Sequence, residues 1–273
     1  MAETTDTITL GILPGGNPEI VQKQALVLAQ KVQDKLKKPV QVLIPKNYKG
    51  LIDAIKTKKV DFAFFSSMTF VEYEKETPLT VLLKKTWDGP YYYSALVVKK
   101  KSALKSLKDL NNKIIAFVDE NSTSGYLYPQ VYLQKNKMAA AAFKSVVFSG
   151  SHAQSVDLLE KDKADVIAVF ANDEKGIKGA WTQFSKDKSI TYRVLWISEP
   201  IPNDPIVVRS EFYTDNPKLT HEIMYTLIEI QNDLMTRAEV NEVLGHGDLM
   251  PATSRQYEPV REMVNTFRAS LKL

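Results

Sequence analysis

The sequence predicts an α/β fold organised as two lobes. The chain has 273 residues, and roughly 150 residues are typical of one domain, so two domains are favoured over one. Apolar, strand-like segments alternate with amphipathic, helix-like segments, which is typical of parallel sheets covered by helices. This alternation stops before Lys99 and then starts again. We therefore expect two α/β lobes, followed after Pro205 by a mainly helical stretch.

The first lobe begins with a strand, a loop and a helix. Ile8, Leu10 and Ile12 alternate with small or polar residues, which is the period of a strand, and the turn residues 14–16 end it. Asn17 is then a favourable N-cap, and apolar side chains recur at helical spacing up to residue 36. The segments that follow predict a strand over 40–44, a helix over 50–57 and a buried strand over 60–65.

The second lobe shows the same kind of alternation. It predicts helices over 103–110, 125–137 and 153–161, and strands over 113–118, 146–148, 164–170 and 193–197. Two amphipathic helices, over 219–235 and 260–271, form the tail of the chain. No internal repeat of fixed period is apparent in the sequence.

Composition and charge exclude several classes of function. Cysteine is absent, which excludes disulfides, a thiol nucleophile and thiolate metal sites. The three histidines have no metal-ligand spacing, so we expect no metal and no cofactor. The formal net charge is +4 without long blocks of one sign, which disfavours nucleic acid as a partner and suits a small anion.

The sequence predicts no insertion into a membrane, because no apolar run approaches the roughly 20 residues of a membrane span. Residues 1–6 are polar and acidic, unlike the basic and then apolar start of a signal peptide. A cytoplasmic protein and an exported protein whose signal peptide has been removed are both compatible with this start.

The strongest local signal is the segment 119–126, Asp-Glu-Asn-Ser-Thr-Ser-Gly-Tyr, which lies between a predicted strand and a predicted helix. Its hydroxyls, together with the free N–H groups of a helix N-terminus, are suited to binding an oxyanion. An ordinary Ser/Thr helix cap is the alternative interpretation. The segment lacks the glycine spacing and the Lys-Ser/Thr pair of nucleotide-binding loops, which disfavours ATP and NAD as ligands.

The residue types of a serine hydrolase triad are also present. Ser122 or Ser124 would be the nucleophile, His152 the base and Asp204 the orienting acid. No Gly-x-Ser-x-Gly elbow surrounds either serine, and this disfavours the hydrolase hypothesis.

Three further segments offer side chains suited to a ligand. His152 follows a predicted strand and opens a helix on the sheet edge expected for Ser122, where an imidazole can donate to an anion; a surface or capping role is the alternative. The tyrosines at 91–93 either line a cleft or pack within a strand. Asp204 lies in a proline-rich turn, where capping the turn is the alternative.

Taken in order, these segments resemble the phosphonate/phosphite/phosphate-type substrate-binding proteins of bacterial ABC importers. The resemblance is collinear over nearly the whole chain. Single blocks are weak, but the ordered set is specific. The blocks are Gly11-Ile12-Leu13-Pro14, Asn17-Pro18-Glu19, Tyr48, Val60-Asp61-Phe62-Ala63, Tyr91-Tyr92-Tyr93-Ser94, Asn121-Ser122-Thr123-Ser124-Gly125-Tyr126, Phe148-Ser149-Gly150-Ser151-His152, Ala164-Asp165-Val166 and Ile201-Pro202-Asn203-Asp204-Pro205.

The resemblance implies a two-lobed periplasmic-binding-protein fold, type II-like, in which two α/β lobes are joined by two crossing strands and end in a helical tail. The crossings would fall near 97–99 and 198–204, giving a lobe 1 of 7–97 plus 205–273 and a lobe 2 of 98–204. In similar proteins a Ser-Thr-Ser loop and a histidine hold the phosphonate oxygens, while tyrosines and an aspartate close over the ligand. By resemblance these roles fall on Ser122, Thr123, Ser124, His152, Tyr48, Tyr92 with its neighbour Tyr93, and Asp204.

One position departs from the family pattern. Aminoalkylphosphonate binders of this family resemble one another in carrying an acidic residue shortly after the Asp-Val strand, where it pairs with the ligand ammonium. An ungapped count from Asp165 lands on Asn172, a shift of one residue lands on Asp173, and Glu174 is adjacent. If Asn172 is the equivalent, we expect a ligand without an amine, because a neutral amide would leave an ammonium unpaired in a closed cleft.

We therefore expect a non-enzymatic solute-binding protein, periplasmic or otherwise extracytoplasmic. It would capture a small phosphorus oxyanion in a cleft between its lobes and deliver the anion to an ABC permease. We expect it to be monomeric. A ligand-sensing domain of the same fold that signals to a membrane receptor is the alternative, and a serine hydrolase is less favoured.

Overall fold

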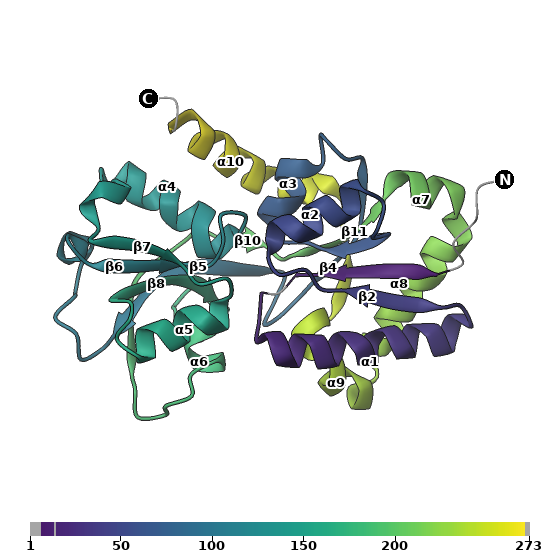
Figure 1. Cartoon of the computed structure of the whole chain (residues 1–273), viewed down its shortest axis with the longest axis horizontal. Coiled ribbons are helices and arrows are strands. Elements are labelled where there is room, and N and C mark those ends of the chain that lie inside the picture. Colours follow the sequence, from purple (N-terminus) through teal and green to yellow (C-terminus); the bar gives the residue numbers. More distant parts are fainter. Residues whose placement is uncertain (1–6, 14, 271–273) are drawn as a thin grey trace. The chain divides into compact units, whose positions relative to one another are not determined.

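The computed structural model describes residues 7–13 and 15–270, and the chain folds into two compact units (Figure 1). Unit 1 comprises Met1–Pro14, Pro18–Pro90 and Asn203–Glu258. Unit 2 comprises Gly15–Asn17, Tyr91–Pro202 and Pro259–Leu273. Each unit is built on its own mixed β-sheet with helices packed against it.

Within the described residues, unit 1 contains a six-stranded sheet in the order β12-β4-β11-β3-β1-β2. Its strands are β1 (Ile8–Ile12), β2 (Val40–Leu43), β3 (Phe62–Phe64), β4 (Leu79–Lys85), β11 (Pro205–Arg209) and β12 (Leu249–Pro251). The strands β3, β1 and β2 are parallel, whereas β11 is antiparallel to β3 and to β4. The helices are α1 (Pro18–Leu36), α2 (Tyr48–Lys56), α3 (Ser67–Tyr73), α7 (Ser210–Asp215), α8 (Pro217–Asn232), α9 (Leu234–Leu244) and the 3-10 turn η4 (Ser254–Tyr257).

The described part of unit 2 also has a six-stranded sheet, with the order β10-β5-β8-β6-β7 and with β9 paired to β5. Its strands are β5 (Tyr91–Lys99), β6 (Ile114–Phe117), β7 (Ser145–Phe148), β8 (Val166–Ala171), β9 (Tyr192–Ile197) and β10 (Ile201–Pro202). Here β8, β6 and β7 are parallel, and β5 runs antiparallel to β8. The helical elements are η1 (Leu107–Leu110), the π-helical turn η2 (Thr123–Leu127), α4 (Tyr128–Lys135), η3 (Ala140–Ala142), α5 (His152–Glu160), α6 (Ala180–Gln183) and α10 (Glu258–Ser270), which begins at the last residue of unit 1.

Most of the predicted elements are present with small shifts at their ends. The helix expected over 50–57 begins at Tyr48, because the side chain of Asn47 caps it by accepting the Gly50 N–H at 2.9 Å. The sequence pattern did not predict α3 or β4, the two elements that come after β3 in the chain. Among the helices of the described ranges, none is long and apolar enough to cross a membrane.

The two units differ from the lobes expected from the sequence at two places. The expected boundary at residues 97/98 falls inside β5, whose residues Tyr93 to Val97 pair continuously with β8. The strand cannot be divided without breaking that ladder, so unit 2 begins at Tyr91. The last helix also groups with unit 2, where Phe267 packs edge-on against Tyr126 at 5.7 Å between ring centroids.

The two strands at which the chain passes between the units lie side by side. Tyr92 of β5 pairs with Ile201 of β10, and Tyr91 pairs with Pro202, in an antiparallel register. The longest segment of unit 2, Tyr91–Pro202, begins at the start of β5 and ends at the end of β10. The two crossing strands expected from the sequence are thus β5 and β10.

Candidate anion-binding site

One edge of the unit 2 sheet gathers most of the predicted site residues. Because β8, β6 and β7 are parallel, their carboxyl ends lie at the same edge, which is where α/β sheets bind ligands. Ser122 follows β6, His152 follows β7 and Asn172 follows β8. Since β5 is antiparallel to β8 and Tyr93 pairs with Ala171, the start of β5 lies at this edge as well.

The Ser-Thr-Ser segment forms a tightly bonded turn at the start of a continuous helical stretch, η2 followed by α4. Ser122 is the N-cap, and its hydroxyl accepts the Gly125 N–H at 3.1 Å. The π-helical form of the turn is a feature often found at functional sites. The capping role that the sequence left as an alternative is therefore correct for Ser122.

Thr123 and Ser124 lie almost completely buried at the N-terminal end of this helix. Among the described residues, the hydroxyl of Ser124 has no hydrogen-bond partner. The first N–H groups of a helix point away from its body and carry partial positive charge. The turn therefore presents hydroxyl and amide donors to an anion without using a Lys or an Arg.

His152 is the first residue of α5 and is 8% exposed. Burial lowers the pKa of His152 to about 3, so the imidazole is neutral at physiological pH. Its ring packs edge-on against Phe170, with 4.9 Å between the ring centroids. Its Nδ1 atom is buried and has no hydrogen-bond partner within the described part of the chain, an arrangement suited to a ligand that supplies the partner.

The three residues of the loop after β8 that the sequence count left open have different surroundings. The carboxylate of Asp173 accepts the N–H groups of Lys175, Ile177 and Lys178 at 2.7–3.1 Å. Both of its oxygens are used in shaping the loop, and Glu174 is exposed. The Oδ1 atom of Asn172 is instead buried and lacks a hydrogen-bond partner among the described residues. Of these three side chains, Asn172 is the one suited to meet a ligand.

The tyrosines at the start of β5 have different surroundings. Tyr91 is about half exposed, at 49%, whereas Tyr92 is buried. Tyr93 points to the other face of the strand and packs against the apolar cluster around Val169 and Trp181. Strand packing, the alternative left open by the sequence, therefore applies to Tyr93.

Two predicted site residues, Tyr48 and Asp204, belong to unit 1. Tyr48 is the first residue of α2 and is buried. The Oδ2 atom of Asp204 lies 3.5 Å from the Nζ atom of Lys85. The preceding residue, Asn203, is fixed by two hydrogen bonds: its Nδ2 donates to the Gly89 carbonyl at 2.7 Å, and its carbonyl accepts the Tyr257 hydroxyl at 2.8 Å.

Sequence analysis did not assign a role to Ser94 of β5, although it noted the residue. Its hydroxyl donates to the Ser124 carbonyl at 2.6 Å and is completely buried. A serine directly before the apolar run of 95–98 was the signal of this contact in the sequence.

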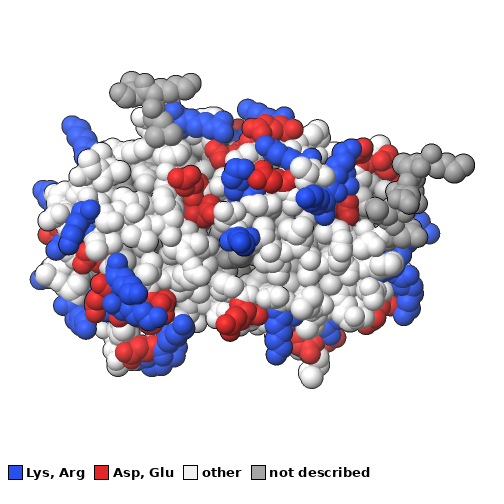
Figure 2. Space-filling view, viewed as in Figure 1, with Lys and Arg blue, Asp and Glu red and all other residues white. Residues whose placement is uncertain are grey.

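No hydrogen bond joins His152 to Ser122 or to Ser124 in the described residues, so the contacts of a serine hydrolase triad are not formed. The ranges that the structure describes also contain no cluster of His, Asp and Glu suited to a metal. Acidic and basic side chains are interspersed over the face seen in Figure 2.

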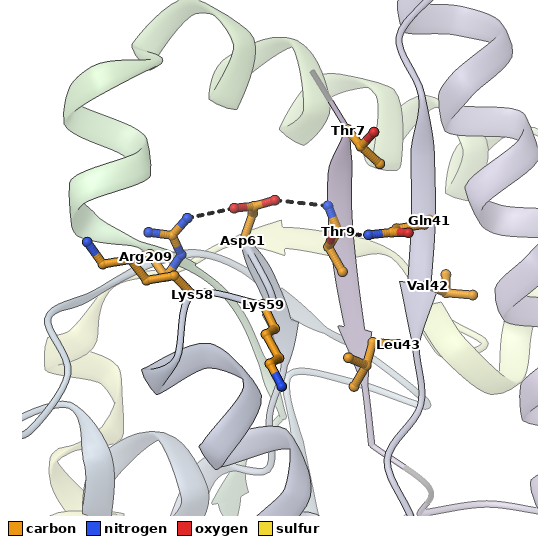
Figure 3. A pocket seen from close by; sticks show the side chains of 9 residues that line it. All are labelled: Thr7, Thr9, Gln41, Val42, Leu43, Lys58, Lys59, Asp61 and Arg209. Atoms are coloured by element: carbon orange, nitrogen blue, oxygen red, sulfur yellow. Dashed lines mark hydrogen bonds and ion pairs between the residues drawn. The ribbon is translucent and has the colours of Figure 1, made fainter. Parts of the chain in front are cut away.

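A polar pocket of about 620 Å³ lies elsewhere, at the amino ends of β1 and β3 in unit 1 (Figure 3). At its centre, the Asp61 carboxylate accepts the Thr9 N–H at 2.9 Å and pairs with Arg209 at 2.7 Å. Lys58 at its rim pairs with Glu211 at 2.7 Å. Its basic groups are thus largely neutralised within the chain, and these bonds join the two strands to β11.

Comparison with known proteins agrees with this geometry. The family model described as ABC transporter, phosphonate, periplasmic substrate-binding protein matches residues 10–257. The chain is 26% identical over 268 residues to the phosphonates-binding periplasmic protein of Escherichia coli K12, covering 96% of this chain and 77% of the relative. It is 22% identical over 268 residues to a probable ABC transporter phosphite binding protein of Prochlorococcus marinus, covering 94% and 88%.

A solved structure shares the fold over nearly the whole chain. The structure of PhnD1 from Prochlorococcus marinus in complex with methylphosphonate superposes with a TM-score of 0.83 at 21% identity, covering 96% of this chain and 98% of the other. This likeness shows the periplasmic-binding-protein fold, and the family match extends over most of the chain. The chain therefore belongs to the family of phosphonate-type periplasmic substrate-binding proteins of ABC transporters, which bind solutes and are not enzymes.

Proposed function

We propose that this protein captures a small phosphorus oxyanion without an amine at the carboxyl edge of the unit 2 sheet and delivers it to an ABC permease. The observation that supports this most directly is the set of neutral donors at that edge. Thr123 and Ser124 stand at a helix N-terminus, and His152 has a buried ring nitrogen with no hydrogen-bond partner among the described residues. Relatives named for phosphonate and phosphite binding support the choice of phosphorus oxyanions.

Neutral donors are suited to a desolvated oxyanion that must also be released. Hydrogen bonds to a charged acceptor are stronger than those between neutral groups, and the helix N-terminus adds a favourable field. A neutral imidazole donates one hydrogen bond, and the Nδ1 of His152 is buried without a hydrogen-bond partner within the described residues. The site thus combines specificity for oxygen acceptors with moderate electrostatic attraction.

The ligand class without an amine follows from the loop after β8. An ammonium group in a site closed to water needs a carboxylate partner. Asp173 has both carboxylate oxygens engaged by backbone N–H groups, and Asn172 is neutral. Methylphosphonate, phosphite and phosphate are therefore favoured over aminoalkylphosphonates.

Tyr48 and Asp204 are proposed as ligand contacts from unit 1 on the strength of the family resemblance. The hydroxyl of a buried tyrosine donates to an anion readily. Asp204 could accept a hydrogen bond from a protonated phosphorus oxygen or pair with a ligand amine. Lys85 near its Oδ2 offsets its charge, which favours the first role. We further propose that the protein acts outside the cytoplasm as a monomer.

Calorimetric titration tests the ligand class directly. The purified protein is unfolded and refolded to remove any carried ligand, and is then titrated with phosphate, phosphite, methylphosphonate and 2-aminoethylphosphonate. We expect binding of at least one amine-free anion, with little heat from the aminated one. Tight binding of 2-aminoethylphosphonate alone would overturn the amine-free assignment, and no binding of any of the four would remove the ligand class.

A further inference from the structure

We propose that Ser94 is a positioning residue for the anion-binding turn, and this inference rests on the proposed function of Ser124 as a ligand contact. Ser94 lies on β5, 30 residues before Ser124 in the chain, and its hydroxyl donates to the Ser124 carbonyl at 2.6 Å. It would act on the ligand through this carbonyl and not by touching the ligand itself.

Every carbonyl of the turn 122–125 has a donor, and three of the four donors are backbone N–H groups. The Ser122 carbonyl accepts from Leu127 at 3.0 Å, and the Gly125 carbonyl accepts from Val118 at 3.1 Å. The Thr123 carbonyl accepts the N–H of Tyr128. The carbonyl of Ser124 is the exception, because its donor is a side chain.

The sequence explains why the helix does not supply this donor. In the π-helical pattern of this turn, a carbonyl accepts the N–H five residues later, as Ser122 does from Leu127. The residue five positions after Ser124 is Pro129, which has no N–H. The residue four positions after it, Tyr128, already donates to Thr123. The buried carbonyl of Ser124 therefore has no donor within this helix, and without Ser94 it would lose the donor that it has.

Ser94 is itself fixed in place by Ser198, the residue that directly follows β9. The Ser94 N–H donates to the Ser198 hydroxyl at 2.9 Å, and the Ser198 N–H donates to the Ser94 carbonyl at 2.9 Å. Ser94 is completely buried, and burying a hydroxyl is unfavourable unless it is hydrogen-bonded. A serine is therefore favoured at this position because its hydroxyl forms this hydrogen bond, and not because its side chain fills space.

The bond sets the orientation of the peptide between Ser124 and Gly125. A trans peptide is planar, so fixing the Ser124 carbonyl also fixes the Gly125 N–H, which donates to the Ser122 hydroxyl. The Ser124 carbonyl and the Gly125 N–H are thus both fixed, and we expect this to hold the Ser124 hydroxyl in a constant direction. Loss of the Ser94 hydroxyl should release this peptide and weaken ligand binding through Ser124.

A double-mutant cycle measured by ligand affinity tests the proposal. The variants are Ser94→Ala, Ser124→Ala and the double variant. The unaltered protein is first titrated with methylphosphonate and with phosphite, and the ligand that it binds more tightly is used for the whole cycle. We expect Ser94→Ala to raise the Kd about tenfold, or about 1.4 kcal/mol. In the Ser124→Ala background the same change should raise the Kd about twofold or less, because the hydroxyl that Ser94 positions is already gone.

Two further variants separate positioning from stability. Ser185→Ala is the matched control, since it removes a hydroxyl that donates to Glu160 at 2.7 Å elsewhere in unit 2; it should lower the Tm and leave the Kd unchanged. If Ser94→Ala does not fold, Ser94→Cys keeps nearly the same volume with a weaker donor and should raise the Kd by a smaller factor.

The outcomes distinguish this inference from the proposed function. Equal effects of Ser94→Ala in both backgrounds, or a Kd that does not change, would overturn the positioning role while leaving the site intact. An unchanged Kd in Ser124→Ala would instead remove Ser124 as a ligand contact, and the positioning role of Ser94 would fall with it.

Discussion

Tyr48 and His152 occupy the same position in their two units. Each is the first residue of a nine-residue helix, and each helix follows a strand in a parallel pair, β2 beside β1 for Tyr48 and β7 beside β6 for His152. Each helix has an N-cap in extended conformation whose side chain accepts the N–H three residues later, from Asn47 to Gly50 and from Ser151 to Gln154. Tyr48 therefore stands at the carboxyl edge of its own sheet, as His152 does.

The correspondence continues through the next turn and strand. Lys58 and Asp162 both have a positive φ, of 58° and 55°. Asp61 then accepts the Thr9 N–H of β1 at 2.9 Å, and Asp165 accepts the Ile114 N–H of β6 at 2.8 Å. This repeated segment supports Tyr48 as a ligand contact equivalent to His152.

The hydroxyl of Ser124 should contribute directly to ligand affinity. Ser124→Ala removes a buried donor, and losing one hydrogen bond to a charged group weakens binding by about 1 to 3 kcal/mol. The Kd for the preferred anion, measured by calorimetry, should rise accordingly. Ser145→Ala, at an exposed position on β7, should leave the Kd unchanged. A Kd for Ser124→Ala equal to that of the unaltered protein would contradict the anion-binding turn.

Two substitutions in the loop after β8 should have different effects, one on ligand affinity and the other on the stability of the fold. Asn172→Asp places a carboxylate near the anion, and we expect the Kd for amine-free anions to rise by about tenfold or more through like-charge repulsion. Asp173→Asn should instead lower the free energy of unfolding by about 1 to 3 kcal/mol, because backbone N–H groups lose charged acceptors, with little change in the Kd. Competition calorimetry and urea denaturation measure the two effects. The opposite assignment, with Asp173 controlling affinity, would mean that the loop rearranges on binding.

His152 should make the ligand-free protein less stable in weak acid. Its folded-state pKa, about 3, lies below the value of about 6.5 expected in the unfolded chain. Below pH 6.5 the unfolded state therefore binds the extra proton, and stability is lost as the pH falls towards 3. By pH 5.5 this group alone lowers the free energy of unfolding by about 1.4 kcal/mol.

The variant His152→Asn isolates this contribution. Chemical denaturation between pH 7.5 and 5.5 should show a shallower loss of stability in the variant than in the unaltered protein. His221 and His246 are present in both proteins and cancel in the comparison. Parallel stability profiles would show that the imidazole is not buried in its neutral form.

Gly125 should be intolerant of a side chain, because the turn packs closely there. An added Cβ would lie 2.5 Å from Val118 Cγ2 and 2.8 Å from the Ser122 hydroxyl. We expect Gly125→Ala to lower stability by about 1 to 3 kcal/mol and to weaken ligand binding, since the clash displaces the capping serine. Gly89→Ala is the control, because a Cβ there has no atom within 4 Å among the described residues. If thermal denaturation and calorimetry give the same stability and the same Kd for Gly125→Ala and Gly89→Ala, the close packing at Gly125 is contradicted.

Local patterns predicted much of the fold. The period-two strand over 8–12, the helix after Asn17 and the hydroxyl-rich turn before a helix all depend on neighbours within a few residues. The duplicated segment was not apparent, because 48–65 and 152–169 share only Asp53/Asp157, Lys59/Lys163 and Asp61/Asp165. The backbone geometry is repeated in these two segments, whereas most of their side chains differ.

The sequence by itself determined the alternation of strands and helices and the turn of Ser122 to Ser124, because periodicity and helix caps are local properties. Only the tertiary structure decided that β5 belongs wholly to unit 2 and that Ser94 completes the turn around Ser124. These facts depend on strand register and on hydrogen bonds between residues distant in the chain, and such bonds form only when the sheet brings its strands together.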